Sequence, residues 1–108
     1  MNKITIASAM ILNNNKEILL VRKEGSTFFQ LPGGKVNNNE THFETLKREL
    51  FEEIHLEIEE LNCIFLGYHE TDAVNEKNTR VCGNLFEVID TNIDNIQLQN
   101  EIEEIAWI

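Results

Sequence analysis

The chain has 108 residues, of which 42% are apolar, and a formal net charge of −10 at pH 7. This length fits a single compact domain over residues 1–108. Because so acidic a molecule repels nucleic-acid backbones and acidic membranes, we expect a small-molecule partner and exclude a polymeric nucleic acid or a membrane.

Two apolar runs, residues 3–12 and 17–22, predict a pair of strands joined by an Asn-rich turn as a β-hairpin. The first run is too short to span a bilayer and lacks a small-residue cleavage site, so the cytoplasm is the expected location. Cys63 and Cys82 lack a zinc-type spacing, and we interpret them as two buried thiols in a reducing compartment.

The strongest local pattern predicts a helix over residues 42–54. Thr41 and Glu44 fit a capping box, and apolar residues then recur at helical spacing at Phe43, Leu46, Leu50 and Ile54. Upstream, the Pro-Gly-Gly step at 32–34 excludes a helix and a regular strand ladder. Downstream we predict strands over 62–69 and 80–89, a polar loop over 70–79, an irregular segment over 90–99 and a final short strand at 106–108.

Three carboxylates, Glu49, Glu52 and Glu53, follow at helical spacing beside the apolar positions and form one acidic stripe. Like charges at this spacing destabilise a helix by about 0.2 to 0.5 kcal/mol per pair. The stripe is therefore either a solvated face or the binding site of something positive. Oxygen-only carboxylate clusters suit hard cations such as Mg²⁺ or Mn²⁺, which typically bridge a protein to substrate phosphates.

The segment from Gly34 to Leu56 resembles the Nudix box, whose pattern is Gly, five residues, Glu, seven residues, and Arg-Glu-apolar-x-Glu-Glu-x-Gly-apolar. The matching residues are Gly34, Glu40, Arg48, Glu49, Leu50, Glu52, Glu53 and Leu56. His55 replaces the usual glycine near the end of the pattern. The segment from Leu31 to Lys35 and the late stretch from Glu101 to Trp107 also look like parts of this family.

The resemblance implies a role for each matching residue. Glu49, Glu52 and Glu53 would bind one to three Mg²⁺ ions, with Mn²⁺ as a possible substitute, and Gly33 would add its carbonyl. Arg48 would orient the glutamates, and Glu40 would pair with Arg48 or lie near the metal cluster. Glu49 or Glu101 would act as the base. Residues expected at the substrate are Gly34, Lys35 and Phe29.

Several residues keep alternative interpretations. For Glu101 a solvated turn is as good an explanation as a functional one, because Glu103 and Glu104 stand close by. We interpret His55 as a helix cap with positive φ rather than as a base. His42 and His69 are expected at the surface or in strands.

Four aromatic residues are also ambiguous. Of Phe28 and Phe29, we expect one to pack in the core and the other to be available to a nucleobase. Tyr68 and Trp107 carry the same ambiguity.

The expected fold is α+β, a Nudix-type α/β/α sandwich with a mixed β-sheet. Because the chain stops at Ile108, the outer helix expected after Trp107 would be absent, which would expose apolar surface and favour either a homodimer or a reduced stability. The implied activity is that of a Mg²⁺-dependent pyrophosphohydrolase acting on a nucleoside diphosphate linked to another moiety, such as an NTP, an oxidised dNTP, ADP-ribose or a nucleotide sugar. The alternative is a Nudix-type domain without hydrolytic activity that senses a nucleotide or binds a protein. Residues that select the substrate are expected in loops 23–30 and 70–79.

Overall fold

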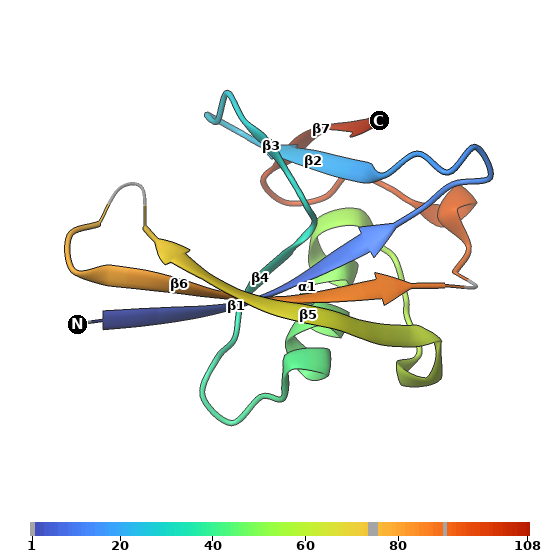
Figure 1. Cartoon of the computed structure of the whole chain (residues 1–108). Helices are drawn as coiled ribbons and strands as arrows, with labels where there is room; N and C mark the ends of the chain where they lie inside the picture. The colour runs from blue at the N-terminus through green and yellow to red at the C-terminus, as the bar shows by residue number, and fades with distance from the viewer. Residues whose placement is uncertain (1, 74–75, 90) are drawn as a thin grey trace.

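Seven strands form two sheets beside one α-helix in the computed structural model, which describes residues 2–73, 76–89 and 91–108 (Figure 1). The elements in chain order are β1 (Asn2–Ile11), β2 (Leu19–Lys23), β3 (Phe29–Gln30), β4 (Gly33–Lys35), α1 (His42–Ile54), β5 (Cys63–Asp72), β6 (Thr79–Val88) and β7 (Ile102–Trp107). Short 3-10 turns lie at Glu60–Asn62 and Ile93–Asn95. This arrangement confirms the predicted α+β class with a mixed sheet.

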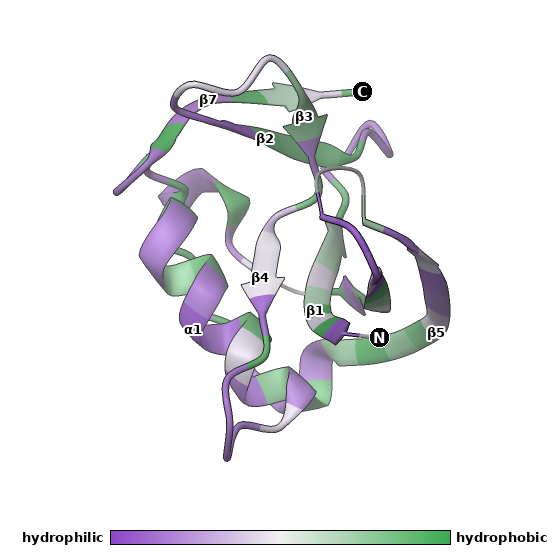
Figure 2. Ribbon diagram, turned by 90° about the vertical axis from the view of Figure 1, so that its left-hand side faces the viewer, coloured by the Kyte–Doolittle hydropathy of each residue, from purple (hydrophilic) through white to green (hydrophobic). Residues whose placement is uncertain are grey.

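The larger sheet has the order β4-β1-β6-β5 and the smaller one has the order β3-β2-β7. β1 is central because it pairs antiparallel with β4 on one side and parallel with β6 on the other. In Figure 2, α1 lies on one side of β4 and β1, and the smaller sheet lies across one end of this pair. The turn between β3 and β4 therefore leads from one sheet to the other next to the helix.

The predicted hairpin of residues 3–12 and 17–22 is wrong. β1 and β2 belong to different sheets and are joined only by an isolated bridge between Leu12 and Ile18. The next strand along the chain, β2, pairs instead with β7 along its whole length and with β3 at Val21 and Arg22, so it belongs to the smaller sheet.

The predicted helix over 42–54 is confirmed residue for residue. Thr41 accepts a hydrogen bond from the Glu44 N–H (3.1 Å), and the Glu44 carboxylate accepts one from the Thr41 N–H (2.8 Å), which completes the capping box. At the other end His55 adopts a left-handed conformation with φ of 56° and its N–H is bonded to carbonyls of the last turn. His55 therefore caps the helix, as the sequence predicted.

The core lies between α1 and the sheets. Ala7 and Ala9 of β1 are fully buried, and these small side chains let the helix approach the sheet closely. The largest fully buried side chains are those of Ile11, Leu19, Val21, Leu46, Leu50, Ile54 and Leu56. None of the helices in the described part of the chain is long and apolar enough to cross a membrane.

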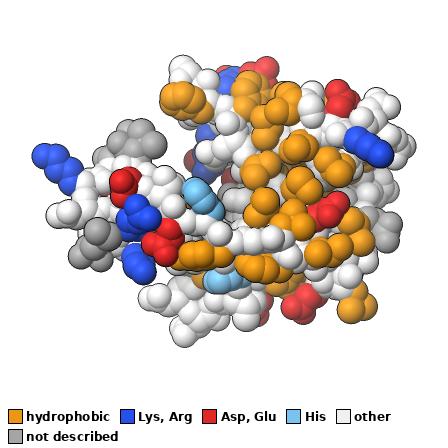
Figure 3. Space-filling view, viewed as in Figure 1, with side chains coloured by type: hydrophobic (Ala, Val, Ile, Leu, Met, Phe, Trp, Pro, Cys, Tyr) orange, Lys and Arg blue, Asp and Glu red, His pale blue; other side chains and the backbone are white. Residues whose placement is uncertain are grey.

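Apolar side chains on β5 are exposed, among them Phe65, Leu66 and Tyr68. Figure 3 shows hydrophobic side chains gathered on the face that carries β5. Within the described residues α1 is the single α-helix, so one outer layer of the predicted α/β/α arrangement is present.

Three smaller predictions need correction. The Pro-Gly-Gly step does not exclude a strand ladder, because Gly33 and Gly34 belong to β4 and pair with Ser8 and Ala7 of β1. Phe28 and Phe29 are both exposed, at 76% and 39%, since Phe28 precedes β3 and Phe29 lies in β3, a two-residue strand at the edge of the smaller sheet. Cys82 is buried but Cys63, at the start of the edge strand β5, is only half-buried.

The predicted element boundaries also shift. The loop predicted over 70–79 is shorter, since β5 runs to Asp72 and β6 begins at Thr79, with residues 74 and 75 of that loop outside the described residues. The final strand begins at Ile102 rather than at residue 106, and residue 90 of the predicted irregular segment also lies outside the described residues.

Candidate active site

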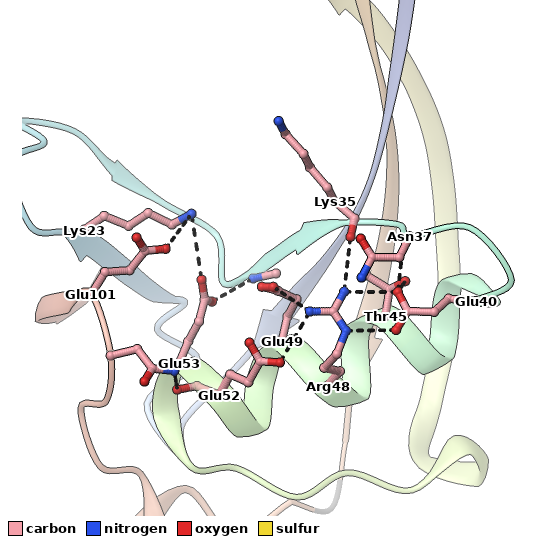
Figure 4. Close-up of polar contacts among 12 residues, drawn as sticks. Lys23, Lys35, Asn37, Glu40, Thr45, Arg48, Glu49, Glu52, Glu53 and Glu101 are labelled. Carbon is pink, nitrogen blue, oxygen red and sulfur yellow. Dashed lines mark hydrogen bonds and ion pairs between the residues drawn. The ribbon is translucent and has the colours of Figure 1, made fainter.

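The glycine turn and the acidic stripe of α1 meet directly. A Cβ atom on Gly34 would lie 2.4 Å from the carboxylate carbon of Glu49, so only glycine leaves room for that carboxylate. The neighbouring Gly33 donates its N–H to the Glu53 carboxylate (3.2 Å). The Pro-Gly-Gly step thus places backbone beside two of the three predicted metal ligands, as Figure 4 shows.

The three glutamates of the stripe differ in burial. Glu53 is only 4% exposed, and burial raises its pKa to about 7 despite the hydrogen bond from Gly33. Glu49 is half-buried, and burial likewise raises its pKa. Glu52 is the most open of the three, with 47% of its side chain exposed. Because the buried carboxylates resist ionisation, a cation that offsets their charge would bind here favourably.

Arg48 links the stripe to Glu40. Its guanidinium donates two hydrogen bonds to Glu40 (2.8 and 3.0 Å) and longer ones to Glu49 (3.3 Å) and Glu52 (3.4 Å). It also donates to the backbone carbonyl of Lys35 (3.3 Å). Arg48 therefore ties the helix to the strand β4 and fixes the carboxylates from one side (Figure 4).

Substituting Glu40 by Gln should weaken the fold near neutral pH and matter little in acid. The Arg48 hydrogen bond, helped by bonds from the Asn37 N–H and the Thr45 hydroxyl, lowers the pKa of Glu40 to about 2. A lowered pKa adds stability that is present above about pH 4.5 and lost as the pH falls towards 2. Urea unfolding at pH 7 and pH 3 should show a difference between wild type and variant that shrinks in acid, and an equal difference at both pH values would contradict this account.

Lys23, at the end of β2, is a site residue that the sequence analysis missed. Its ammonium lies 3.5 Å from Glu101 and 4.0 Å from the buried Glu53 (Figure 4). The sequence pattern predicts a loop at Lys23, and the residues next to it match no motif. Its position becomes apparent only from the pairing of β2 with β7, which sets Lys23 opposite Ile102 and hence next to Glu101.

The pairing of β2 with β7 also distinguishes Glu101 from the two nearby glutamates, Glu103 and Glu104. Glu103 and Glu104 both bind Arg22, at 3.4 and 2.8 Å. Glu101 instead reaches the cluster through Lys23, although 62% of its side chain is exposed. Of the three late glutamates, Glu101 is therefore the one beside the acidic stripe.

A hollow of about 400 Å³ opens beside the glycine turn. It is lined by Ile6, Ser8, Lys23, Gln30, Leu31, Gly33, Gly34 and Lys35. Two of the predicted substrate residues, Gly34 and Lys35, lie in this lining, whereas Phe29 is not part of it. The Lys35 side chain points away from the glutamates in Figure 4, so of the two lysines only Lys23 reaches them.

The histidines lie away from this cluster. His42 and His69 are exposed. His55 lies beyond the end of α1, where its ring stacks at 4.9 Å from the Phe51 ring and lies 3.1 Å from the side-chain amide of Gln99.

The chemistry of the donors fits a hard divalent cation. Glu49, Glu52, Glu53 and Glu101 offer only carboxylate oxygens, the ligands that Mg²⁺ and Mn²⁺ prefer. In the described residues no three acidic, His or Cys side chains already converge at a metal-binding spacing. Glu49 and Glu52 instead form ion pairs with Arg48. Glu101 forms one with Lys23, and Glu53 accepts the Gly33 N–H.

Comparison with known proteins agrees with this geometry. The family described as NUDIX domain matches residues 2–108. The structure resembles that of the MutT NUDIX hydrolase from Burkholderia pseudomallei, with a TM-score of 0.82 and 18% identity over 99% of this chain and 83% of that one. It also resembles the MutT protein from Methanosarcina mazei Go1, with a TM-score of 0.79 and 26% identity over 99% and 77% of the two chains.

Curated relatives match a shorter stretch. The RNA pyrophosphohydrolase of Pasteurella multocida (strain Pm70) is 30% identical over 60 residues, which are 56% of this chain and 30% of that protein. The chain thus matches less than a third of the length of this relative. The family match over nearly the whole chain, the shared fold and the glutamates gathered at the Gly33–Gly34 turn place the chain in the Nudix hydrolase family.

Proposed function

We propose that this chain is a Mg²⁺-dependent pyrophosphohydrolase that cleaves a phosphoanhydride bond in a nucleoside diphosphate linked to another moiety. The observation that carries the proposal is the contact of the acidic stripe with the glycine turn, where Glu53 accepts the Gly33 N–H and the Glu49 carboxylate lies against Gly34, and both glycines line the 400 Å³ hollow. Glu49, Glu52, Glu53 and Gly33 would hold the cation, with Mn²⁺ as a possible substitute for Mg²⁺.

The residues of the cluster would have different roles in the reaction. A bound divalent cation would supply charge neutralisation for the diphosphate and lower the pKa of a water molecule. Arg48 holds Glu49 and Glu52 in place, while Lys23 brings positive charge to the hollow that would receive the phosphates. We favour Glu49 over Glu101 as the group that accepts the proton from water, because Glu49 is half-buried and held by Arg48 whereas Glu101 is mostly exposed.

A second candidate substrate is the 5′-phosphorylated end of an RNA. It is favoured by the resemblance to proteins named RNA pyrophosphohydrolase. The net charge of −10 disfavours binding along an RNA strand, so only the terminal phosphates and the first nucleotide would contact this chain.

The test is a panel of NTPs, oxidised dNTPs, ADP-ribose, nucleotide sugars and a 5′-triphosphorylated RNA, each assayed with and without Mg²⁺. We expect Mg²⁺-dependent cleavage of at least one member, seen as release of a nucleoside monophosphate or, for the RNA, of phosphate or pyrophosphate, and little cleavage by the Glu52→Gln and Glu53→Gln variants. Glu57→Gln is the matched control, because Glu57 is exposed and lies just beyond the acidic stripe. Folded, metal-loaded protein that cleaves none of these compounds would contradict the proposal and favour a nucleotide-sensing or protein-binding domain.

A further inference from the structure

A segment distant in the sequence, residues 97–100, closes the C-terminal end of α1, and we call it the docking segment. The last carbonyls of a helix have no partner within the helix itself. Three donors of the docking segment bind three consecutive carbonyls at this end: the Gln97 N–H binds that of Ile54 (2.9 Å), the Gln99 N–H that of Glu53 (3.0 Å) and the Asn100 side-chain amide that of Glu52 (2.8 Å). The docking segment thus holds the turn of α1 that carries two of the predicted metal ligands.

Asn100 suits its position in two respects. Its φ of 52° lies in the left-handed region, which asparagine adopts more readily than most residues. Its side-chain amide also supplies the third of the three donors. Glycine could adopt the same φ but would leave the Glu52 carbonyl without this hydrogen bond. The side chain, rather than the backbone conformation alone, therefore accounts for asparagine here.

His55, which stands where the Nudix pattern has glycine, adds a second side-chain contact. Its Nδ1 atom lies 3.1 Å from the side-chain amide nitrogen of Gln99, and its ring lies 4.9 Å from the Phe51 ring. Glycine would adopt the left-handed cap, with φ of 56°, at less cost but could make neither contact. The histidine therefore ties the helix cap to the docking segment in a way that the usual glycine could not.

The docking segment leads directly into Glu101 and β7. The Gln99 carbonyl accepts the Ile102 N–H (3.1 Å), which forms a tight turn around Glu101. The Glu101 carbonyl accepts the Glu24 N–H (2.7 Å), and the Glu101 carboxylate lies 3.5 Å from the Lys23 ammonium. Backbone and side chain of Glu101 thus both hold the end of β2, where Lys23 lies.

Lys23 and Glu53 come from different parts of the fold. Glu53 lies near the end of α1, whereas Lys23 ends β2 of the smaller sheet. Their charged atoms are 4.0 Å apart, the outer limit of an ion pair, so a small shift of the smaller sheet relative to α1 would separate them. The docking segment binds the end of α1 on one side and continues on the other into Glu101, the partner of Lys23 (Figure 4). It therefore links the two charged groups.

We propose that the docking segment positions the pair of Lys23 and Glu101 over the acidic stripe, and that Asn100 and His55 are positioning residues for phosphate binding. Lys23 lines the 400 Å³ hollow, so a displaced ammonium would attract phosphates there less strongly. Asn100 and His55 lie outside the lining of that hollow and act through the docking segment. This inference rests on the proposed function for the presence of phosphates in the hollow.

The first experiment removes each contact without removing a backbone conformation. Asn100→Gly and His55→Gly both keep a residue that suits a positive φ. Each should weaken binding of imidodiphosphate, a pyrophosphate analogue that resists hydrolysis, by about two- to tenfold in calorimetric titrations with Mg²⁺, the effect of losing one hydrogen bond. Asn39→Gly is the matched control, because Asn39 has φ of 71°, is exposed and precedes the opposite end of α1. Unchanged affinity in both variants would overturn the proposal.

The second experiment distinguishes positioning from a merely structural role. If Asn100 acts through Lys23, then Asn100→Gly should cause no further loss of imidodiphosphate affinity in a protein that already carries Lys23→Gln. The same test applies to His55→Gly. Losses of equal size with and without Lys23 would show that the two residues only support the fold, and would overturn the proposal.

The binding measurement also separates this inference from the proposed function. Coupling of Asn100 to Lys23 in a protein that cleaves no compound of the panel would remove the proposed hydrolase activity and leave the positioning role standing. Cleavage by the wild type without any such coupling would overturn the positioning role alone. Failure of the wild type to bind imidodiphosphate in the presence of Mg²⁺ would overturn both.

Discussion

Replacing Glu53 by Gln should reduce kcat/KM at least a hundredfold while leaving the fold intact. Glu53 is buried, accepts the Gly33 N–H and faces Lys23, so it occupies the centre of the proposed cation site. Gln can still accept the Gly33 hydrogen bond but brings no charge. Changing a residue that merely supports a metal ligand typically costs about 10- to 100-fold, so loss of a ligand should exceed this.

Stability measurements distinguish this effect from unfolding. Burial raises the pKa of Glu53 to about 7, so in the metal-free protein its ionisation opposes folding increasingly as the pH rises from about 4.5 through 7. The Gln variant lacks this penalty, and at pH 8 it should melt at a temperature no lower than that of the wild type. An active Glu53→Gln protein, or one that melts well below the wild type at pH 8, would contradict the role given to this carboxylate.

Replacing Gly33 by Ala should largely unfold the protein. A Cβ atom at this position would lie 2.1 Å from the Ala7 carbonyl oxygen and 2.8 Å from the Ser8 Cα, both rigid backbone of β1. Gly33 also has φ of 145°, a conformation that other residues rarely adopt. Backbone strain costs about 1–3 kcal/mol and overpacking costs about the same again. Together these penalties are comparable with the whole stability of a small domain, which starts at about 5 kcal/mol.

A second glycine separates the two causes. Gly25 also has a positive φ, of 81°, but a Cβ atom there meets nothing within 4 Å. Gly25→Ala should therefore show the strain alone, with a loss of about 1–3 kcal/mol in urea unfolding. If both variants lose the same stability, the contact between β4 and β1 is not what demands glycine at position 33.

Local patterns in the sequence predicted the elements that depend on local interactions. The helix over 42–54 was correct to the residue because Thr41 and Glu44 satisfy its first turn from within the segment itself. The pairing of Arg48 with Glu40, which the family resemblance implied, is present for a similar reason, since both residues lie on or next to one helix. His55 caps this helix in the left-handed conformation that its position in the pattern predicted.

Features that depend on strand pairing could not be predicted. The pairing of β1 with β4 and β6 overrode the expected hairpin, and nothing in the residues of β1 specifies these partners. Lys23 joins the site only because β2 pairs with β7.

The parallel pairing of β1 with β6 also sets the order of events during synthesis. Asn2 pairs with Thr79 and Ile11 with Val88, so β1 is synthesised well before its longest partner, β6, exists. Contacts so distant in sequence slow folding. Until β6 emerges, the edge of β1 that pairs with it presents unpaired backbone N–H and C=O groups, which favour aggregation. Substitutions that weaken β6 should therefore reduce the yield of folded protein in cells more than they reduce its equilibrium stability.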